Sequence, residues 1–472
     1  MYKHLLTYSV LFLFGCGGGE DGGSSGSNSQ TQAPIVDLVK ADANQSMFSP
    51  PSGGITELAQ VSGYEIVVDI LPLDLNADGY MDIVLSRTPH DYKGLALQAL
   101  VNDKNGTFKD ESSFYFGKIG NNWRWVEKLY AADLNSDGWL EIIPHVDLVN
   151  DGERTLPILV RQVDGSFDLN NNSVLRAQSG GYIPIDINAD GKIDVLSRNV
   201  DGFGNQGVQE HKFVFLKNHS SGEGFLGFED LGVISVDSNN GSGSPSFVYA
   251  PAVVDVNNDN LDDLVLGGPK WVGDSFVNDA APVKVFLNKN GSQLVEESQL
   301  VFATVPSYVH VREMELADFN GNGFMDILSI NSGYDGMPYP GESNAIYFND
   351  SSASLTLDTG DSSSHNYAGM THSGTVGDID QDGDIDIVYV DLSGLDVPWS
   401  SKVRILLNDG NGNFTNSNYQ LPNQYSAINW AATSSYLIDL NVDSYPELVL
   451  GGMDSSFVSV VLWNDGLGNF SN

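Results

Sequence analysis

A run of nine residues rich in aspartate and asparagine occurs seven times in this chain of 472 residues. The first copy is Asp74-Leu75-Asn76-Ala77-Asp78-Gly79-Tyr80-Met81-Asp82, and successive copies start 53 to 69 residues apart. Positions 1, 3, 5 and 9 of every copy hold Asp, Glu or Asn. Hard oxygen ligands at alternate positions of a short loop suit Ca²⁺, which takes about six to eight oxygens at roughly 2.3–2.6 Å. The pattern therefore predicts up to seven structural Ca²⁺ sites.

Each loop offers side chains at positions 1, 3, 5 and 9, and a backbone carbonyl at position 7, where the residue type varies. In chain order the candidate ligands are Asp74, Asn76, Asp78, Tyr80, Asp82; Asp133, Asn135, Asp137, Trp139, Glu141; Asp186, Asn188, Asp190, Lys192, Asp194; Asp255, Asn257, Asp259, Leu261, Asp263; Asp318, Asn320, Asn322, Phe324, Asp326; Asp378, Asp380, Asp382, Asp384, Asp386; and Asp439, Asn441, Asp443, Tyr445, Glu447. Position 6 is Gly in five loops, Asn260 in the fourth and Ser444 in the seventh. Gly and Asn tolerate the left-handed backbone that a tight loop needs. We expect weaker binding in the fifth loop, where Asn322 removes a charge, and in the seventh, which has Ser444.

These loops differ from EF-hand loops, which carry a bidentate Glu at position 12. No copy has an acid there; the residues are Leu85, Pro144, Ser197, Leu266, Ser329, Tyr389 and Leu450. Short apolar runs such as Ile83-Val84-Leu85 follow the loops, so each loop joins strand to strand. Turns without a metal are the alternative, because Asn, Asp and Gly are ordinary turn residues. Seven copies in register favour the metal, since an empty loop crowds three or four carboxylates together.

The repeat also predicts the fold. Each unit of about 60 residues holds a strand, the loop, a second strand, and then a hairpin whose turn is rich in Asn, Asp and Gly. Leu406-Leu-Asn-Asp-Gly-Asn-Gly-Asn-Phe414 is one such hairpin. Four antiparallel strands repeated seven times indicate an all-β, seven-bladed β-propeller. We expect a segment around Ile55–Gln60 to supply the outer strand of the last blade and close the ring, because an open ring would leave an exposed strand edge.

The loops and the Asn-Asp-Gly-Asn-Gly-x-Phe hairpins resemble FG-GAP/VCBS repeats, the units of the integrin α-subunit propeller and of many secreted bacterial proteins. The resemblance covers nearly all of residues 53–472. It implies Ca²⁺ on loops at the lower face of the ring. It leaves function open, because this family includes adhesion proteins, lectins and modules of polysaccharide-processing enzymes, and a fold does not fix a function.

The first residues have the pattern of an export signal. Lys3 and His4 precede an apolar run from Leu5 to Phe14, which is too short to span a bilayer. Leu13-Phe14-Gly15-Cys16 resembles a bacterial lipobox, so residues 1–15 are expected to be a lipoprotein signal peptide and Cys16 the lipidated residue. A plain signal peptide is the alternative. Residues 16–52, rich in Gly and Ser, read as a flexible tether, and 53–472 as the propeller. We therefore expect a protein anchored by lipid in the cell envelope, at the bacterial outer membrane.

The net charge of −40 limits the partners. Seven Ca²⁺ ions would offset only 14 of those charges. The remaining acidity argues against nucleic acid and anionic surfaces as ligands, because both need basic patches. We expect a monomer that meets the membrane only through its lipid.

Aromatic and basic residues cluster before several loops, and an aromatic segment, residues 333–340, follows the fifth; a propeller places both kinds of segment at the opposite face. The candidates for ligand binding are Trp123, Arg124, Trp125, Tyr308, His310, Arg312, Tyr334, His365, His372 and Trp430. Flat rings with a few polar groups suit sugars; packing between blades is the alternative for each residue. We expect a binding or adhesion module for a glycan or protein rather than an enzyme, and no catalytic residue is assigned. The alternative function is a polysaccharide lyase that uses Tyr, His and Arg on that face.

Overall fold

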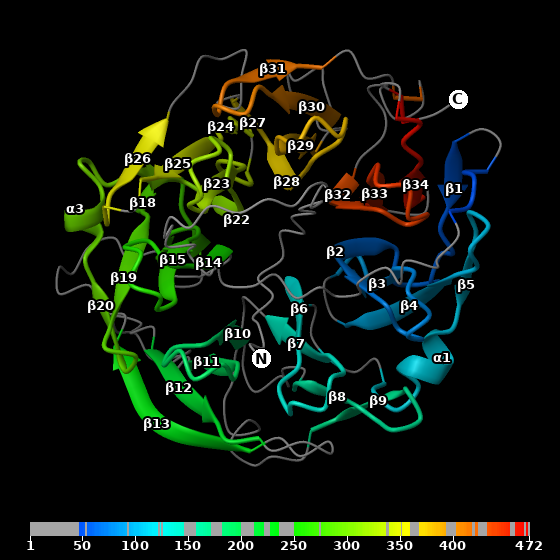
Figure 1. The fold of residues 1–472 in the computed structure, drawn as a ribbon, viewed down its shortest axis with the longest axis horizontal. Helices are drawn as coiled ribbons and strands as arrows, with labels where there is room; N and C mark the ends of the chain where they lie inside the picture. The colour runs from blue at the N-terminus through cyan, green and yellow to red at the C-terminus, as the bar shows by residue number, and fades with distance from the viewer. Residues whose placement is uncertain are drawn as a thin grey trace, which may run out of the picture.

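The computed structural model of the chain is a ring of seven sheets, each of four antiparallel strands (Figure 1). It describes residues 47–470, except for 52–53, 92–93, 121–122, 124–125, 146–156, 171–181, 200–211, 221–226, 236–249, 273–274, 337–338, 351, 359–367, 393–402, 418–420, 423–431, 454–457 and 467–468. The predicted seven-bladed propeller is confirmed. We number the blades 1 to 7 in the chain order of their inner strands, and each acidic loop by its blade.

In every blade the acidic loop connects the inner strand to the second strand. The inner strands are β2 (Ile66–Leu73), β6 (Lys128–Ala132), β10 (Tyr182–Ile185), β14 (Ala250–Val254), β22 (Val311–Ala317), β28 (Thr371–Gly377) and β32 (Ala432–Ile438). The second strands are β3 (Asp82–Thr88), β7 (Glu141–His145), β11 (Asp194–Asn199), β15 (Asp263–Gly267), β23 (Asp326–Asn331), β29 (Asp386–Asp391) and β33 (Glu447–Gly452). All seven loops therefore lie at one end of the ring, which we call the loop face.

The third and outer strands of blades 1 to 6 form the predicted hairpins. The third strands are β4 (Ala96–Asn102), β8 (Leu159–Arg161), β12 (Lys212–Asn218), β19 (Lys284–Lys289), β25 (Ala345–Asn349), β30 (Val403–Asn408) and β34 (Val460–Leu462). The outer strands of blades 1 to 6 are β5 (Phe108–Asp110), β9 (Phe167–Leu169), β13 (Phe228–Ser235), β20 (Gln293–Glu296), β26 (Leu355–Asp358) and β31 (Phe414–Asn416).

Short two-stranded ribbons and single-turn helices lie outside the four-stranded sheets. Three two-stranded ribbons pair β16 (Trp271–Val272) with β17 (Ser275–Phe276), β18 (Ala281–Pro282) with β21 (Ser307–Tyr308), and β24 (Glu342–Ser343) with β27 (Ala368–Gly369). The helices α1 (Ser112–Tyr115) and α3 (Ser298–Val301) are single turns. No helix in the described part of the chain is long and apolar enough to cross a membrane.

The N-terminal strand closes the ring, as predicted. Strand β1 (Ile55–Glu57) pairs with β34, with Ile55 opposite Leu462, and it completes blade 7 (Figure 1). Contacts begin before residue 53, because the ring of Phe48 lies 5.8 Å from that of Trp463, centroid to centroid. The closure leaves no sheet edge open between the first and last blades.

Apolar packing between neighbouring blades holds the ring together. Second strands such as β3 are buried along their whole length, because a blade lies against each face of the sheet. Position 2 of every acidic loop is also apolar and has no exposed surface; these residues are Leu75, Leu134, Ile187, Val256, Phe319, Ile379 and Leu440. Each loop is thus anchored in the core beside its exposed acidic residues.

Hydrogen bonds from a side chain at, or within two residues of, the end of each third strand link every blade to the one before it. In blade 6, Asn408 Nδ2 donates to the carbonyls of Ile385 in its own blade, at 3.1 Å, and of Phe319 in blade 5, at 2.8 Å. Asn102, Asn218, Asn288, Asn349 and Asn464 make the corresponding pairs of bonds. In blade 2, Arg161 replaces Asn and donates to the Leu75 carbonyl of blade 1. The hairpin Asn is therefore also a link between blades.

Replacing Asn408 with Ala is expected to cost about 1–3 kcal/mol of unfolding free energy, because a buried carbonyl in each of two blades loses its donor. Asn411→Ala, in the exposed turn of the same hairpin, is the matched control and should change stability by less than about 0.5 kcal/mol. Denaturant unfolding measures both. Equal losses in the two variants would contradict the role assigned to Asn408.

Candidate metal loops and the opposite face

The side chains of each acidic loop curl around the loop's own backbone. In loop 1, Asp74 accepts hydrogen bonds from the N–H groups of Asp78 (3.1 Å) and Gly79 (2.8 Å). Asn76 also accepts from Asp78, and Asp78 accepts from Tyr80. Loops 2, 3, 4, 5 and 7 repeat all four bonds, and loop 6 repeats three. Residues 1, 3 and 5 of each loop are thereby held around one turn.

Two residues of every loop have the left-handed backbone conformation. One is position 6, as the sequence predicts, with φ of 86° at Gly79 and 77° at Ser444. The other is position 4, where the residues are Ala77, Ser136, Ala189, Asn258, Gly321, Gln381 and Val442. A β-branched residue is a true outlier there, because its side chain crowds the backbone. Val442, with φ of 56°, therefore makes loop 7 the most strained of the seven.

Val442→Asn is expected to stabilise the protein by about 1 kcal/mol, because a left-handed backbone costs most residues about 1–2 kcal/mol and Asn less. Val442→Ala is the control. It retains a Cβ without the polar side chain and should gain less. Thermal unfolding at one fixed calcium concentration measures both, and a loss of stability in the Asn variant would contradict the strain at this position.

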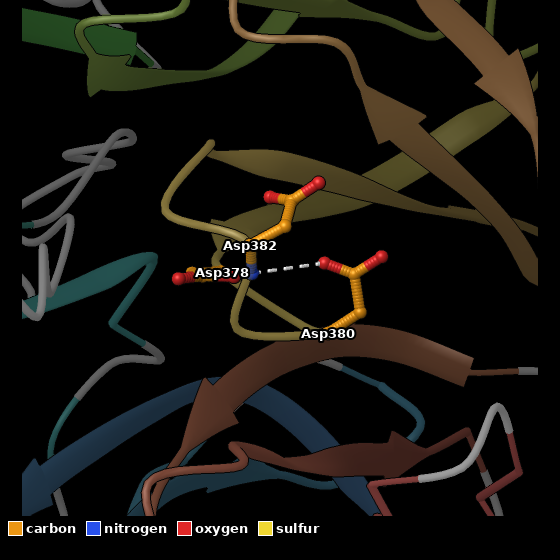
Figure 2. A group of neighbouring side chains, drawn as sticks. All are labelled: Asp378, Asp380 and Asp382. Carbon is orange, nitrogen blue, oxygen red and sulfur yellow. Dashed lines mark hydrogen bonds between the residues drawn. The ribbon is translucent and has the colours of Figure 1, made fainter.

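Loop 6 brings three carboxylates closest together. One oxygen from each of Asp378, Asp380 and Asp382 lies within 4.8 Å of the other two (Figure 2). Oxygens that share a Ca²⁺ at about 2.4 Å are separated by no more than about this distance. Asp378 Oδ1 is buried and accepts no hydrogen bond from any residue that the structure describes. A buried carboxylate oxygen without a donor is costly unless a cation meets it, so loop 6 fits Ca²⁺.

The carboxylate at position 9 is fully buried beneath each loop. In loops 1, 4, 5 and 6 one oxygen accepts the N–H of position 2 and the other the N–H of the third-strand Asn; for Asp82 both distances are 2.8 Å. Each oxygen has a second lone pair, so these bonds leave room for a metal. Burial, and then the charges of Asp74 and Asp78, raise the pKa of Asp82 to about 7. The position 9 residues remain predicted ligands that also tie the loop to the sheet.

Neighbouring side chains distinguish the loops further. Lys104 pairs with Asp78 at 2.9 Å in loop 1, and Lys217 with Asp190 at 3.6 Å in loop 3, where each amino group competes with a cation. In loop 5 the amide of Asn322 donates to the Asn349 carbonyl at 2.8 Å, which occupies the residue that replaces the expected acid. Weaker binding in loops 5 and 7 stays a prediction.

Polar candidates converge on the opposite face, where blades 5 and 6 meet. Asp335, in the segment that follows β23, lies between two of them: its Oδ2 is 2.5 Å from Arg312 Nη2 and 3.3 Å from His310 Nδ1. His372, in β28, interacts with the charges of both Asp335 and Arg312. Arg312 and His372 are the extra residues of β-bulges in β22 and β28. Such bulges re-aim side chains, often beside functional sites. We call His310, Arg312, Asp335 and His372 the mouth cluster.

The mouth cluster combines the Arg312–Asp335 ion pair with the neutral imidazole of His372. Burial alone would raise the pKa of Asp335, but Arg312 and His310 lower it well below its usual range. Burial and then Arg312 lower the pKa of His372 to about 3. His372 Nδ1 lies 2.9 Å from the Thr433 carbonyl, so this nitrogen carries the proton and Nε2 remains an acceptor. His310 is almost fully buried, whereas His372 is partly exposed. The cluster can therefore offer a charged donor and a neutral acceptor.

A model of the FG-GAP-like repeat matches residues 74–143, 255–329, 318–389 and 378–450, and each match starts at position 1 of an acidic loop. The chain belongs to the FG-GAP repeat family. Among curated proteins, no sequence matches it.

Two solved structures resemble the FG-GAP propeller at low identity. One is the crystal structure of the exotype rhamnogalacturonan lyase YesX, with 12% identity over 90% of this chain and 76% of that chain, and a TM-score of 0.42. The other is the V. cholerae biofilm matrix protein Bap1, with 11% identity over 86% of this chain and 89% of that chain, and a TM-score of 0.39. Neither likeness bears on what this chain binds.

Of the remaining candidates on the opposite face, two pack inside the protein, one is partly exposed, and the others lie outside the described residues. Trp123 donates its indole N–H to the Ile119 carbonyl at 2.8 Å and packs against the core, so it is a packing residue. Tyr308 packs against the core between blades 4 and 5, and burial raises its pKa to about 12. Tyr334 is partly exposed next to Asp335. Arg124, Trp125, His365, Trp430 and the lipidation candidate Cys16 lie outside the described residues.

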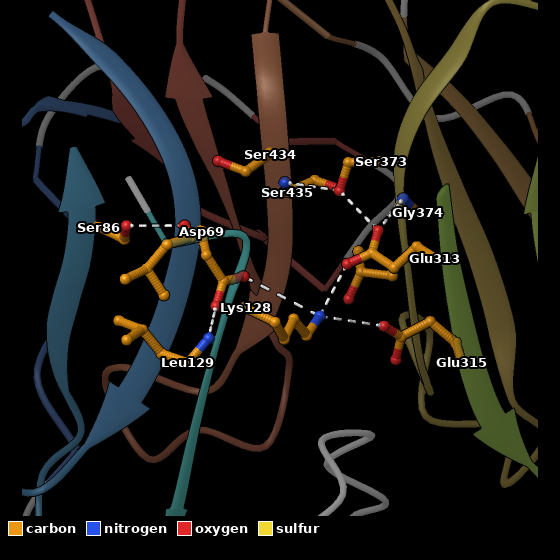
Figure 3. A network of polar contacts seen from close by, with 12 residues as sticks. Asp69, Ser86, Lys128, Leu129, Glu313, Glu315, Ser373, Gly374, Ser434 and Ser435 are labelled. Carbon is orange, nitrogen blue, oxygen red and sulfur yellow. Dashed lines mark hydrogen bonds and ion pairs between the residues drawn. The ribbon is translucent and has the colours of Figure 1, made fainter. Parts of the chain in front are cut away.

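The FG-GAP propeller also carries charged residues in its centre that the sequence analysis did not single out. Lys128, at the start of inner strand β6, reaches Glu313 at 2.7 Å and Glu315 at 3.6 Å in β22, and Asp69 at 3.9 Å in β2 (Figure 3). Glu313 also accepts hydrogen bonds from Ser373 and from the Gly374 N–H of blade 6. The sequence did contain a sign of this network, because these charged residues occur in inner strands that are otherwise largely apolar. This channel network joins four blades across the ring axis.

Proposed function

We propose that this protein is an exported, lipid-anchored binding module whose FG-GAP loops hold structural Ca²⁺ and whose opposite face binds a glycan or protein ligand at the cell envelope. The observation that supports a binding role is that the four residues of the mouth cluster lie close together. Residues from segments about 60 residues apart meet there, and the partly exposed His372 and Tyr334 lie beside a fixed Arg312–Asp335 pair. An aromatic ring with a few oriented polar groups is what a sugar site needs.

Calcium would be held by side chains at positions 1, 3, 5 and 9 and the carbonyl at position 7. When bound, it supplies positive charge that relieves the repulsion among the carboxylates and fixes the loop between two strands. Because native loops bind and unfolded ones do not, calcium stabilises the ring by mass action. The metals act on stability, and the ligand site lies on the other face.

The binding role is tested with purified protein on glycan arrays and against envelope extracts, both in calcium. Saturable binding without turnover is expected, and it should be reduced at least about tenfold in a Tyr334→Ala, His372→Gln double variant. Both replacements fall on partly exposed side chains, and an unchanged melting midpoint would show that the fold survives. Binding that is unaffected by the double variant would contradict a site at the mouth cluster.

A polysaccharide lyase is the second candidate, and the neutral His372 beside Arg312 is the observation that favours it. In such a reaction a neutral base removes a proton next to a carboxylate that a cation neutralises. A new ultraviolet absorbance on incubation with uronic-acid polymers would show the unsaturated product. We assign binding rather than catalysis, because Asp335 already neutralises Arg312.

A further inference from the structure

One aromatic ring on the loop face differs from its equivalents in the other blades. Position 7 of the acidic loops holds Tyr80, Trp139, Lys192, Leu261, Phe324, Asp384 and Tyr445, and only Trp139 is exposed, with 44% of its surface accessible. The large rings at this position in other blades are at least partly covered by neighbouring side chains. For example, the ring centre of Phe48 lies 6.1 Å from that of Tyr80. The largest residue of the set therefore has the least covering.

Trp139 is the outermost layer of a stack that begins in the core. The rings of Phe116 and Phe167 are stacked 5.5 Å apart, with planes 27° from parallel. Arg161 lies between Phe167 and Trp139, with its guanidinium carbon 5.3 Å and 4.7 Å from the two ring centres. Arg161 is itself buried and bonded to the Leu75 carbonyl, as the link between blades 1 and 2. The indole is thus held on one face by a fixed group.

The surface around the indole of Trp139 contains polar loop residues and a few exposed apolar side chains. The backbone N–H of Trp139 donates to Oδ1 of Asp137, the exposed position 5 residue of the same loop, at 2.8 Å. Two other exposed apolar residues belong to the same region: Val163 in the β8–β9 turn, and Phe114, which approaches Gly165 of that turn. These three exposed apolar side chains are far fewer than the roughly 20–30 residues that each partner contributes to a stable protein interface.

We infer that Trp139 is a stacking platform for one pyranose ring of a neutral glycan, forming a second binding site on the loop face. The apolar face of a sugar ring would lie on the open face of the indole. The net charge of −40 disfavours acidic polysaccharides here. The platform is independent of the mouth cluster, because the two lie at opposite ends of the blades. The fixed Arg161 limits the ordering that binding requires.

Affinity electrophoresis of the full chain tests the platform. Native gels containing xylan, mannan, galactan, dextran or a soluble β-glucan are run in calcium. At least one polymer is expected to retard the wild-type protein, and Trp139→Ala should lower the association constant at least about tenfold, whereas Trp139→Phe should retain most of it. Leu300→Ala, at an apolar side chain that is 75% exposed in blade 4, is the surface control.

Three results would overturn the platform: no retardation of the wild type by any polymer, equal retardation of the wild type and Trp139→Ala, or loss in Leu300→Ala as well. A partner protein that Trp139→Ala fails to bind, without any effect on polysaccharides, would also overturn it, because it would make the surface a protein site. The mouth variant Tyr334→Ala, His372→Gln separates the two glycan sites, since it should leave the Trp139-dependent retardation unchanged.

Discussion

Replacing Lys128 with Met is expected to lower the free energy of unfolding by about 3–5 kcal/mol, because it leaves buried carboxylates without their cation. Asp69 and Glu315 are almost fully buried, and among the residues that the structure describes only the amino group of Lys128 reaches both of them and Glu313 (Figure 3). Burial alone would lower the pKa of Lys128, but the charges of Glu313, Asp69 and Glu315 hold it well above its usual value. The amino group is therefore charged at neutral pH.

A surface lysine provides the matched control for Lys128. Lys289 pairs with Glu297 at the same 2.7 Å, but 36% of its side chain is exposed. Lys289→Met should cost less than about 1 kcal/mol, because exposed pairs are screened by water and salt. Urea unfolding in calcium measures both variants. Adding Glu313→Gln to Lys128→Met should restore part of the loss. Equal effects at Lys128 and Lys289 would show that the channel network does not hold the blades together.

Without calcium, the protein is expected to lose stability as the pH rises from 5 to 8. Burial raises the folded-state pKa to about 7 at Asp82, Asp194, Asp263 and Asp326 and to about 8 at Asp386, while unfolded Asp titrates near 3.9. Between these values the native state binds more protons than the unfolded state, so stability falls with rising pH. Allowing for relaxation of the loops, each group contributes on the order of 1 kcal/mol, about 5 kcal/mol in total.

Calcium should reverse that dependence, because a bound cation favours the ionised carboxylates. The difference in melting midpoint between calcium and chelator is therefore expected to be larger at pH 8 than at pH 5. The ion pair at Asp335 does not interfere, since its lowered pKa places its titration below this range. A chelated protein whose midpoint rises from pH 5 to pH 8 would contradict the assignment.

The fold could be predicted because its signals are local. Each acidic loop is a contiguous run, and each hairpin carries its own turn residues, so seven repeats were enough to fix the blades and the closure by β1. The second left-handed residue of each loop was missed, since Ala77 and Val442 carry none of the usual marks of that conformation. Backbone geometry at position 4 is imposed by the loop as a whole and not by the residue that occupies it.

The links between blades and across the channel could not be read from the sequence. Asn408 bonds a carbonyl 89 residues away, and Lys128 meets Glu313 across 185 residues. Such pairs become neighbours only after the ring closes. In the mouth cluster His310, Arg312 and His372 were predicted as candidates, but the β-bulges at Arg312 and His372 were not, and Asp335 was not named as a candidate.

The most direct test of the calcium loops is the melting of the protein in calcium, in chelator, and in chelator followed by excess Ca²⁺ or Mg²⁺. The structure predicts that Ca²⁺ raises the midpoint by at least about 10 °C, that re-addition restores it, and that Mg²⁺ does not, because its smaller, stricter octahedral site differs from these loops. Asp378→Ala together with Asp380→Ala should remove one bound ion per chain. A midpoint that is unchanged by chelation would contradict the account: the seven loops would then be polar turns that need no metal.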